Sequence, residues 1–341
     1  MIKEAIETLV SGRSLTVEEA ASVMEEIMEA KAIPAQLAAF LTALRIKGET
    51  AEEIVGLASV MRAKATRVVM AEPTIDIVGT GGDGSNTFNI STTAAFIAAG
   101  AGLKVAKHGN RAASSQCGSA DVLEALDVRI KLNAEQVRRC IEEVGIGFMF
   151  APVFHPAMKH AAGTRRDIGI RTVFNILGPL TNPAGAKVQV LGVADRALLE
   201  KMALAIKELG CYRALVVHGE DGLDEITIGG QTQVYEVRDD GIKTYSISPE
   251  DVGLTLAGLN SLRGGTVAEN AAMLRSVLTG APGPRRDVVL MNAAAALLVG
   301  DKVDTLRQGV ALAGEIIDSG RATAKLEHLI KFSQTVAESP K

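Results

Sequence analysis

The sequence predicts an α/β protein, with a small N-terminal helical domain and a large α/β domain that has a largely parallel central sheet. Residues 1 to about 66 show helical periodicity and helix-capping motifs throughout. After Met70, short β-branched runs alternate with helical segments, which is typical of strand–helix units in a parallel sheet. The 341 residues suffice for one large and one small domain. We therefore expect domains at 1–70 and 71–341.

The N-terminal helices are defined by their ends. T-x-x-E capping boxes at Thr16 and Thr50 each begin a helix. Another helix begins at Pro34, where a first-turn proline is tolerated, and ends at Gly48. This helix carries an apolar stripe that is either intramolecular core or a dimer seam, made of Leu37, Phe40, Leu41 and Leu44.

The remaining elements follow in order. Expected strands are 74–78, 105–108, 187–192, 213–218 and 232–237. Expected helices are 92–101, 120–126, 134–144, 196–209, 266–279, 287–299 and 305–319. The proline-containing segment 151–185 is expected either to pack back on the N-terminal helices or to form the cleft between the domains.

Composition excludes several classes of protein. The formal net charge is −4, aromatic residues make up 3% and tryptophan is absent, which argues against nucleic-acid binding. Three scattered cysteines (Cys117, Cys140, Cys211) indicate reduced thiols. The N-terminus lacks a signal-peptide core, and no apolar stretch is long enough to span a membrane. We expect a cytoplasmic protein that binds neither nucleic acid nor membrane.

A glycine-rich turn follows the first expected strand. Four of the six residues from Gly79 to Gly84 are glycine, and Ser91–Thr93 then begins a helix. Backbone N–H groups in such a turn, together with a helix N-terminus, suit a phosphate or diphosphate. The alternative is a strand-to-helix turn without a ligand. The order G-T-G-G-D-G is neither a Walker loop nor a dinucleotide fingerprint.

Two further motifs also follow expected strands. The run Lys107–Ser115 combines two cations, an amide and two hydroxyls, which suits phosphate oxygens unless it is simply a solvated loop. Asp224 and Glu225 are adjacent carboxylates that suit Mg²⁺ beside phosphates, unless they form a charged turn.

A fourth motif begins at Arg165. Arginine suits capture of a planar carboxylate, and the alternative is an exposed helix end. None of the five histidines forms a metalloprotease pair, and only His108 lies inside one of these motifs.

The four motifs occur in the order GTGGDGSNTFNIST (79–92), KHGNRAASS (107–115), RTVFNILGPLTNP (171–183) and GLDE (222–225). As a set they resemble the anthranilate phosphoribosyltransferases of tryptophan biosynthesis, and the resemblance covers nearly the whole chain. Small departures stand at Gln116-Cys117, at Asp127, and at Gly163-Thr164 beside Arg165. The resemblance implies a nucleoside-phosphorylase-like fold and a homodimer formed through the N-terminal helices.

The resemblance also implies a reaction: 5-phosphoribosyl diphosphate (PRPP) and anthranilate give N-(5-phosphoribosyl)anthranilate and diphosphate, with Mg²⁺ as cofactor. The residues it implies for PRPP are Gly79, Gly82, Asp83, Thr87, Asn89, Ile90, Ser91, Thr92, Lys107, His108, Gly109, Asn110, Arg111, Ala112, Ala113, Ser114, Ser115 and Ser119. Those for anthranilate are Gly79, His108, Asn110 and Arg165, and those for Mg²⁺ are Ser91, Asp224 and Glu225. An aryl amine is neutral at pH 7, so we expect no essential general base.

Two other functions are weighed against this one. A pyrimidine-nucleoside phosphorylase shares the fold, but its K-x-S-G-R motif and T-G-G-T-x-D-K continuation do not follow Lys107 here. A non-catalytic nucleic-acid-binding relative would show a basic surface and eroded metal carboxylates. This chain is acidic and keeps Asp224 and Glu225.

Overall fold

The computed structural model describes residues 1–112 and 116–338. Its N-terminal part is wholly helical, with α1 (Ile2–Val10), α2 (Val17–Met28), α3 (Pro34–Lys47) and α4 (Ala51–Lys64). The capping boxes at Thr16 and Thr50 both form, with side-chain and backbone hydrogen bonds in each direction. The apolar stripe of α3 is intramolecular core, since its four side chains are at most 2% exposed.

A seven-stranded sheet forms the centre of the larger part, in the order β3-β2-β1-β4-β5-β6-β7. The strands are β1 (Ile75–Gly79), β2 (Val105–Gly109), β3 (Ile146–Phe150), β4 (Val188–Gly192), β5 (Arg213–Gly219), β6 (Thr232–Arg238) and β7 (Gly241–Ile247). The first five are parallel, and β6 and β7 add antiparallel pairs. The predicted fold class is confirmed, although β3 and β7 were not expected.

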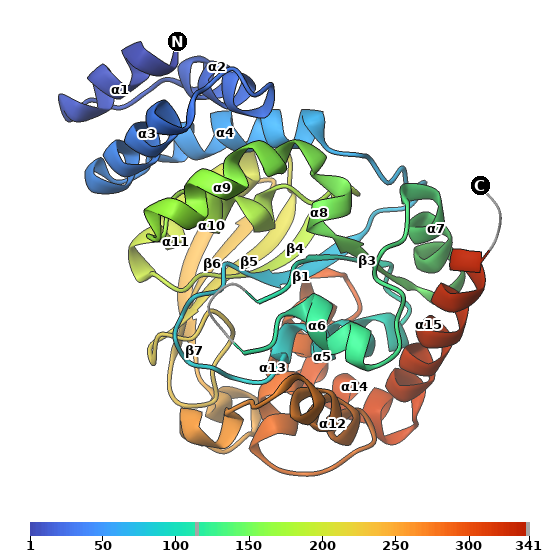
Figure 1. Cartoon of the computed structure of the whole chain (residues 1–341). Helices are drawn as coiled ribbons and strands as arrows, with labels where there is room; N and C mark the ends of the chain where they lie inside the picture. The colour runs from blue at the N-terminus through green and yellow to red at the C-terminus, as the bar shows by residue number, and fades with distance from the viewer. Residues whose placement is uncertain (113–115, 339–341) are drawn as a thin grey trace.

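Helices cover both faces of this sheet (Figure 1). They are α5 (Ile90–Gly100), α6 (Ser119–Ala125), α7 (Ala134–Arg139), α8 (Ala151–Phe154), α9 (Lys159–Ile168), α10 (Phe174–Leu177), α11 (Leu199–Glu208), α12 (Val267–Leu278), α13 (Pro284–Val299), α14 (Leu306–Asp318) and α15 (Arg321–Glu338). Helix α15 was not predicted from the sequence. Within the described ranges, no helix is long and apolar enough to cross a membrane.

Alternation along the strands produces two separate cores. On β5, Leu215 and Val217 join the core that contains α5 and α13, whereas Val216 joins the core that contains the N-terminal helices. The second core also takes in Ala161 of α9 and Phe174 of α10. In Figure 1 these two short helices lie between α3 and α4 on one side and the sheet on the other. The segment around 151–185 is therefore packed against the N-terminal helices.

Candidate active site

The glycine loop, the end of β2 and the two adjacent acids lie at the carboxyl edge of the parallel strands. Gly79 ends β1, Gly109 ends β2, and Asp224 and Glu225 lie in the loop that follows β5. This loop folds back over the neighbouring strand ends: a Cβ on Gly192, at the end of β4, would lie 1.6 Å from the Asp224 carbonyl oxygen. The carboxyl edge of a parallel sheet is the usual place for ligands in α/β proteins.

Asp224 packs against the start of the glycine loop (residues 79–84). A Cβ on Gly79 would lie 2.3 Å from Asp224 Oδ2, and the Gly81 N–H donates to the same oxygen at 2.6 Å. Gly81, Gly82 and Gly84 all have φ near +70°, a region that suits glycine. Glycine is therefore required at 79 because a carboxylate from a distant loop packs directly on the backbone, and at 81, 82 and 84 because of the positive φ.

The rest of this loop leads into helix α5. Asp83 accepts hydrogen bonds from the amide and hydroxyl of Ser85, and Thr87 forms an isolated antiparallel bridge with Arg263. Asn89 is the N-cap residue, and its side-chain amide donates to the Cys117 carbonyl rather than capping the helix. The helix thus begins at 90, slightly earlier than predicted.

The first turn of α5 is held by a carboxylate and a lysine. The Ser91 N–H donates to Glu225 Oε1 at 3.1 Å, and Lys107 Nζ donates to the Ser91 hydroxyl at 3.3 Å. An anion at a helix N-terminus is favoured by the free amides and the helix dipole. The side chains of Ile90 and Thr92 are turned into the core, each 1% exposed. Only their backbone groups therefore face the loop.

Of the two acids of this site, Glu225 is buried and Asp224 is half-buried. Burial raises the pKa of Asp224 well above its usual range, and the charges of Asp83 and Glu225 add to this. Burial also raises the pKa of Glu225 to about 7, against the attraction of Lys107. Lys107 is itself buried, which lowers its pKa, and its Nζ donates to the Ile77 carbonyl at 2.6 Å. Such a cluster gains from a cation that neutralises the carboxylates.

The donor set fits Mg²⁺ bound partly by other ligands. Asp224, Glu225 and the Ser91 hydroxyl supply hard oxygen atoms, which Mg²⁺ prefers. Among the residues the structure describes, no three His, Cys, Asp or Glu side chains form a metal-binding group. A Mg²⁺ ion here would take its other ligands from substrate oxygens and water, as is usual in phosphate-binding sites.

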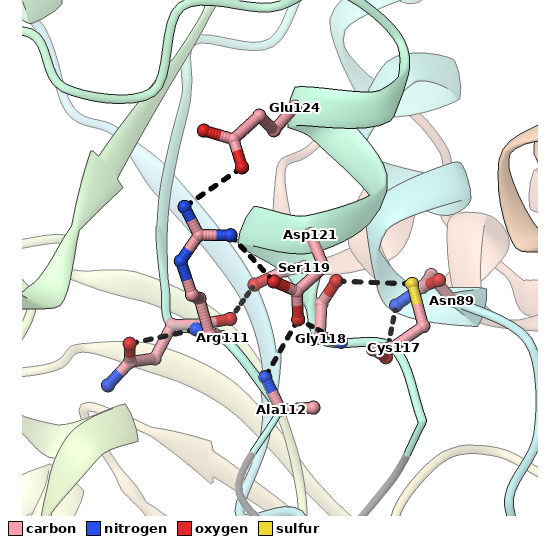
Figure 2. A network of polar contacts seen from close by, with 9 residues as sticks. Asn89, Arg111, Ala112, Cys117, Gly118, Ser119, Asp121 and Glu124 are labelled. Atoms are coloured by element: carbon pink, nitrogen blue, oxygen red, sulfur yellow. Dashed lines mark hydrogen bonds and ion pairs between the residues drawn. The ribbon is translucent and has the colours of Figure 1, made fainter. Parts of the chain in front are cut away.

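The described part of the second motif is joined by hydrogen bonds and ion pairs to the start of α6 (Figure 2). Asp121 of α6 accepts hydrogen bonds from the amides of Ala112 and Gly118, both at 2.9 Å. Arg111 forms ion pairs with Asp121 at 2.8 Å and Glu124 at 2.9 Å, so its charge is already balanced within the turn. The predicted residues Ala113, Ser114 and Ser115 lie outside the described residues.

Ser119 packs tightly against the same turn. Its hydroxyl donates to the Asn110 carbonyl at 3.3 Å, and a Cβ on Gly109 would lie 2.2 Å from that hydroxyl. Glycine at 109 therefore allows α6 to begin directly beside the end of β2.

His108 is buried and neutral. Its Nδ1 lies 3.2 Å from the Gly178 carbonyl oxygen, which can only accept, so Nδ1 carries the proton. Burial, with a smaller contribution from His155, lowers the pKa of His108 to about 3. The two rings lie 5.1 Å apart. Its Nε2 is left as a buried acceptor without a partner among the described residues.

Arg165 lies on α9, away from the glycine loop in sequence. Its guanidinium stands 5.1 Å from the centre of the Phe174 ring, and burial lowers its pKa. In the described part of the chain no ion pair or hydrogen bond involves this guanidinium; the Arg165 backbone carbonyl accepts from the Gly169 N–H. A partly desolvated arginine without an acid is suited to bind a carboxylate from a ligand. The structure shows no contact between Arg165 and the other predicted anthranilate residues.

Sequence reasoning missed a buried residue that supports the site. Asp76 of β1 accepts hydrogen bonds from Asn182 Nδ2 at 2.7 Å and from the His108 amide at 3.4 Å. Burial raises its pKa to about 6. A carboxylate inside an apolar strand, next to the glycine loop, was the available signal. Through its hydrogen bond from the His108 amide, Asp76 holds the end of β2, which carries Lys107 and His108.

Comparison with known proteins identifies the family of the chain. The helical bundle domain model of the glycosyl transferase family matches residues 3–65, and the a/b domain model of that family matches residues 71–323. The anthranilate phosphoribosyltransferase of Dehalococcoides mccartyi is 63% identical over 339 residues, 99% of both chains. That of Chloroflexus aggregans is 61% identical over 335 residues, 98% of both chains.

Solved structures agree as well. The enzyme from Thermus thermophilus superposes with a TM-score of 0.92 at 48% identity, over 97% of this chain and 99% of that one. The enzyme from Saccharomyces cerevisiae in complex with PRPP and Mg has a TM-score of 0.91 at 32% identity, over 98% of both chains. With the motifs, the fold and these relatives in agreement, the chain belongs to the anthranilate phosphoribosyltransferase family.

Proposed function

We propose that the carboxyl edge of this sheet is where the chain carries out the reaction of its family. That reaction transfers the 5-phosphoribosyl group of PRPP to the amine of anthranilate, releasing diphosphate, in tryptophan biosynthesis. The observation that carries the assignment is the packing of Asp224 against the glycine loop and of Glu225 against the first turn of α5. The yeast relative was solved with PRPP and Mg.

The donor half of the site binds and holds the leaving group. Asp224, Glu225 and Ser91 would hold Mg²⁺, which supplies positive charge to the departing diphosphate. The amides of the glycine loop and the first turn of α5 bind phosphate oxygens, and Lys107 adds a buried positive charge beside them. PRPP contacts are assigned to the residues named for it above, with Ile90 and Thr92 acting through their backbone groups.

The acceptor half positions the nucleophile. Arg165 binds the carboxylate of anthranilate, and Asn110 and Gly79 are assigned to the same acceptor site because the family resemblance implies it. His108 is neutral because its pKa is about 3, and its unpartnered Nε2 accepts a hydrogen bond from the amine. The amine attacks while uncharged, and its proton becomes acidic only after the N–C bond forms. The contribution of these residues is therefore positional, without an essential general base.

The helical part of the chain is assigned to dimer formation. The four exposed large apolar side chains of residues 1–46 (Met1, Val10, Ile33 and Ile46) lie on or beside α1 and α3. We expect Ile46→Glu, on a side chain 82% exposed, to shift a dimer toward monomer in sedimentation, whereas Leu256→Glu, 47% exposed and far along the chain, leaves it unchanged. A monomeric native protein would contradict this assignment.

Two further assignments accompany the reaction. We place the domain boundary at 70/71. Residues 151–185 are assigned to the helical domain, because apolar side chains between Ala161 and Leu180 share one core with the N-terminal helices. We assign the reaction to the cytoplasm, because the three cysteines are free and buried.

The direct test is loss of anthranilate fluorescence on mixing purified protein with PRPP and Mg²⁺, with and without EDTA. Loss that requires both PRPP and the metal establishes the reaction. If the protein is folded and PRPP is intact but no fluorescence is lost, the proposal fails. Release of thymine from thymidine and phosphate would instead indicate a nucleoside phosphorylase.

A further inference from the structure

Arg171 rests directly on the glycine loop, although it stands about ninety residues further along the chain. It lies in the short connection between α9 and α10, and its Nη2 donates to the Gly81 carbonyl oxygen at 2.8 Å. A Cβ on Gly82 would lie 1.1 Å from Arg171 Nη1. The guanidinium thus occupies the space that any side chain at 82 would need, which explains glycine there independently of its φ of +73°.

Gly81 is held through both of its backbone groups. Its N–H donates to Asp224 at 2.6 Å, and its carbonyl accepts from Arg171. Within the described residues Arg171 has no acidic partner, so the Gly81 carbonyl is its one directed contact. One bond comes from the metal-site loop, and the other comes from the segment that carries Arg165. The glycine loop therefore joins the two halves of the site.

The bond to the carbonyl fixes the direction of the next amide. In a trans peptide the C=O and the following N–H point in opposite directions, so holding the Gly81 carbonyl aims the Gly82 N–H away from Arg171. The amides of Gly82, Asp83 and Gly84 have no hydrogen-bond partner in the described part of the chain. Successive free amides at glycines with positive φ form a concave anion-binding surface.

We propose that Arg171 is a positioning residue for the donor, which orients the free amides of the glycine loop toward the diphosphate of PRPP. This rests on the proposed function, which assigns PRPP to the loop. Arg171 stands six residues after Arg165 on the same segment. The segment that binds the carboxylate of the acceptor therefore also sets the position of the donor loop.

The test compares Arg171→Gln with Arg166→Gln. Arg166 belongs to the same segment, but its side chain is 83% exposed and its nearest acid is Asp167 at 4.0 Å. Both variants lose one positive charge, so only the contact with the loop differs. The first measurement is the Kd for PRPP with Mg²⁺ and without anthranilate, by calorimetry. The second is millisecond hydrogen–deuterium exchange of the peptide 79–85 in the free protein.

Loss of one hydrogen bond that preorganises the loop should weaken PRPP binding about three- to tenfold in Arg171→Gln. The Gly81 amide should exchange faster, because the loop leaves Asp224 more often. Arg166→Gln should match the native protein in both measurements. Arg171→Lys should recover little, since an ammonium does not reproduce the planar contact with Gly82.

Three results overturn the inference. An unchanged exchange rate of the loop in Arg171→Gln does so whether or not PRPP binds. Equal PRPP affinity of Arg171→Gln and Arg166→Gln shows that the contact with the loop does not affect donor binding. Full recovery of PRPP affinity in Arg171→Lys shows that only the positive charge at this position matters. Failure of the native protein to bind PRPP refutes the proposed function instead, and it removes the donor from the inference even if Arg171 still holds the loop.

Discussion

Replacing Arg165 by Gln tests the acceptor site most sharply. The guanidinium is partly buried, is stacked on Phe174 at 5.1 Å and has no acidic partner in the described part of the chain. The protein therefore loses little by its removal: the cation–π contact is worth about 0.5–1 kcal/mol. A bound carboxylate loses much more, because it is left facing a site without a counter-charge.

The size of the effect follows from this difference. Hydrogen bonds to a charged group contribute about 1.5–3 kcal/mol. Losing that interaction corresponds to a rise of about 10- to 150-fold in KM for anthranilate. KM for PRPP should stay within about twofold, since in the described part of the chain no hydrogen bond or ion pair joins the Arg165 side chain to a residue assigned to PRPP. If the arginine also orients the amine for attack, kcat falls as well.

The assay is initial-rate loss of anthranilate fluorescence at saturating PRPP and Mg²⁺. Arg166→Gln serves as the charge-matched control, and thermal unfolding monitors stability in both variants. A KM for anthranilate in Arg165→Gln within twofold of that in Arg166→Gln would refute carboxylate binding by Arg165. A rise in the KM for PRPP of the same size would place Arg165 on the donor side instead.

Four further predictions concern three residues. His108→Gln should reduce turnover by less than about 100-fold, because a general base is worth about 10²–10⁴-fold, and loss of all chemistry with intact binding would contradict the mechanism. The folded pKa of His108, about 3, lies below its ordinary 6.5, so the unfolded chain takes up the proton first as pH falls. The free energy of unfolding therefore falls below pH 6.5, by up to about 1.4 kcal/mol per pH unit. Urea titrations at pH 7.5 and at pH 5 measure this fall, which should be smaller in His108→Gln than in the native protein. Asp224→Asn should raise the Mg²⁺ concentration needed for half-maximal rate more than about tenfold, because a metal ligand is lost. The same substitution should raise the melting temperature, because it removes a desolvated negative charge. A lower melting temperature would count against this charge argument. Gly56→Ala should lower the free energy of unfolding in urea by about 1–3 kcal/mol, because a Cβ would lie 2.3 Å from a backbone oxygen of α2. The control Gly163→Ala, which has open space around it in α9, should be neutral or stabilising. Equal effects of the two substitutions would refute the packing argument.

Local signals in the sequence were sufficient for most of the fold. The capping boxes at Thr16 and Thr50 and the glycine at the end of α3 act within a few residues, so the sequence alone shows where these helices begin and end. The strand before the glycine loop was equally clear. By contrast, β3 is buried at every position, and a short apolar run without alternation does not distinguish a strand from a helix. The edge strand β7 depends on pairing with β6.

The site divides in the same way. The amino-acid sequence specifies which residue types stand at the strand ends, because each motif is a continuous run. It does not specify that Asp224 meets Gly81, 143 residues earlier, or that Arg171 lies on Gly82. These contacts arise where loops from separate strands cross at one edge of the sheet. Their geometry follows from the packing of both cores, and no local pattern encodes it.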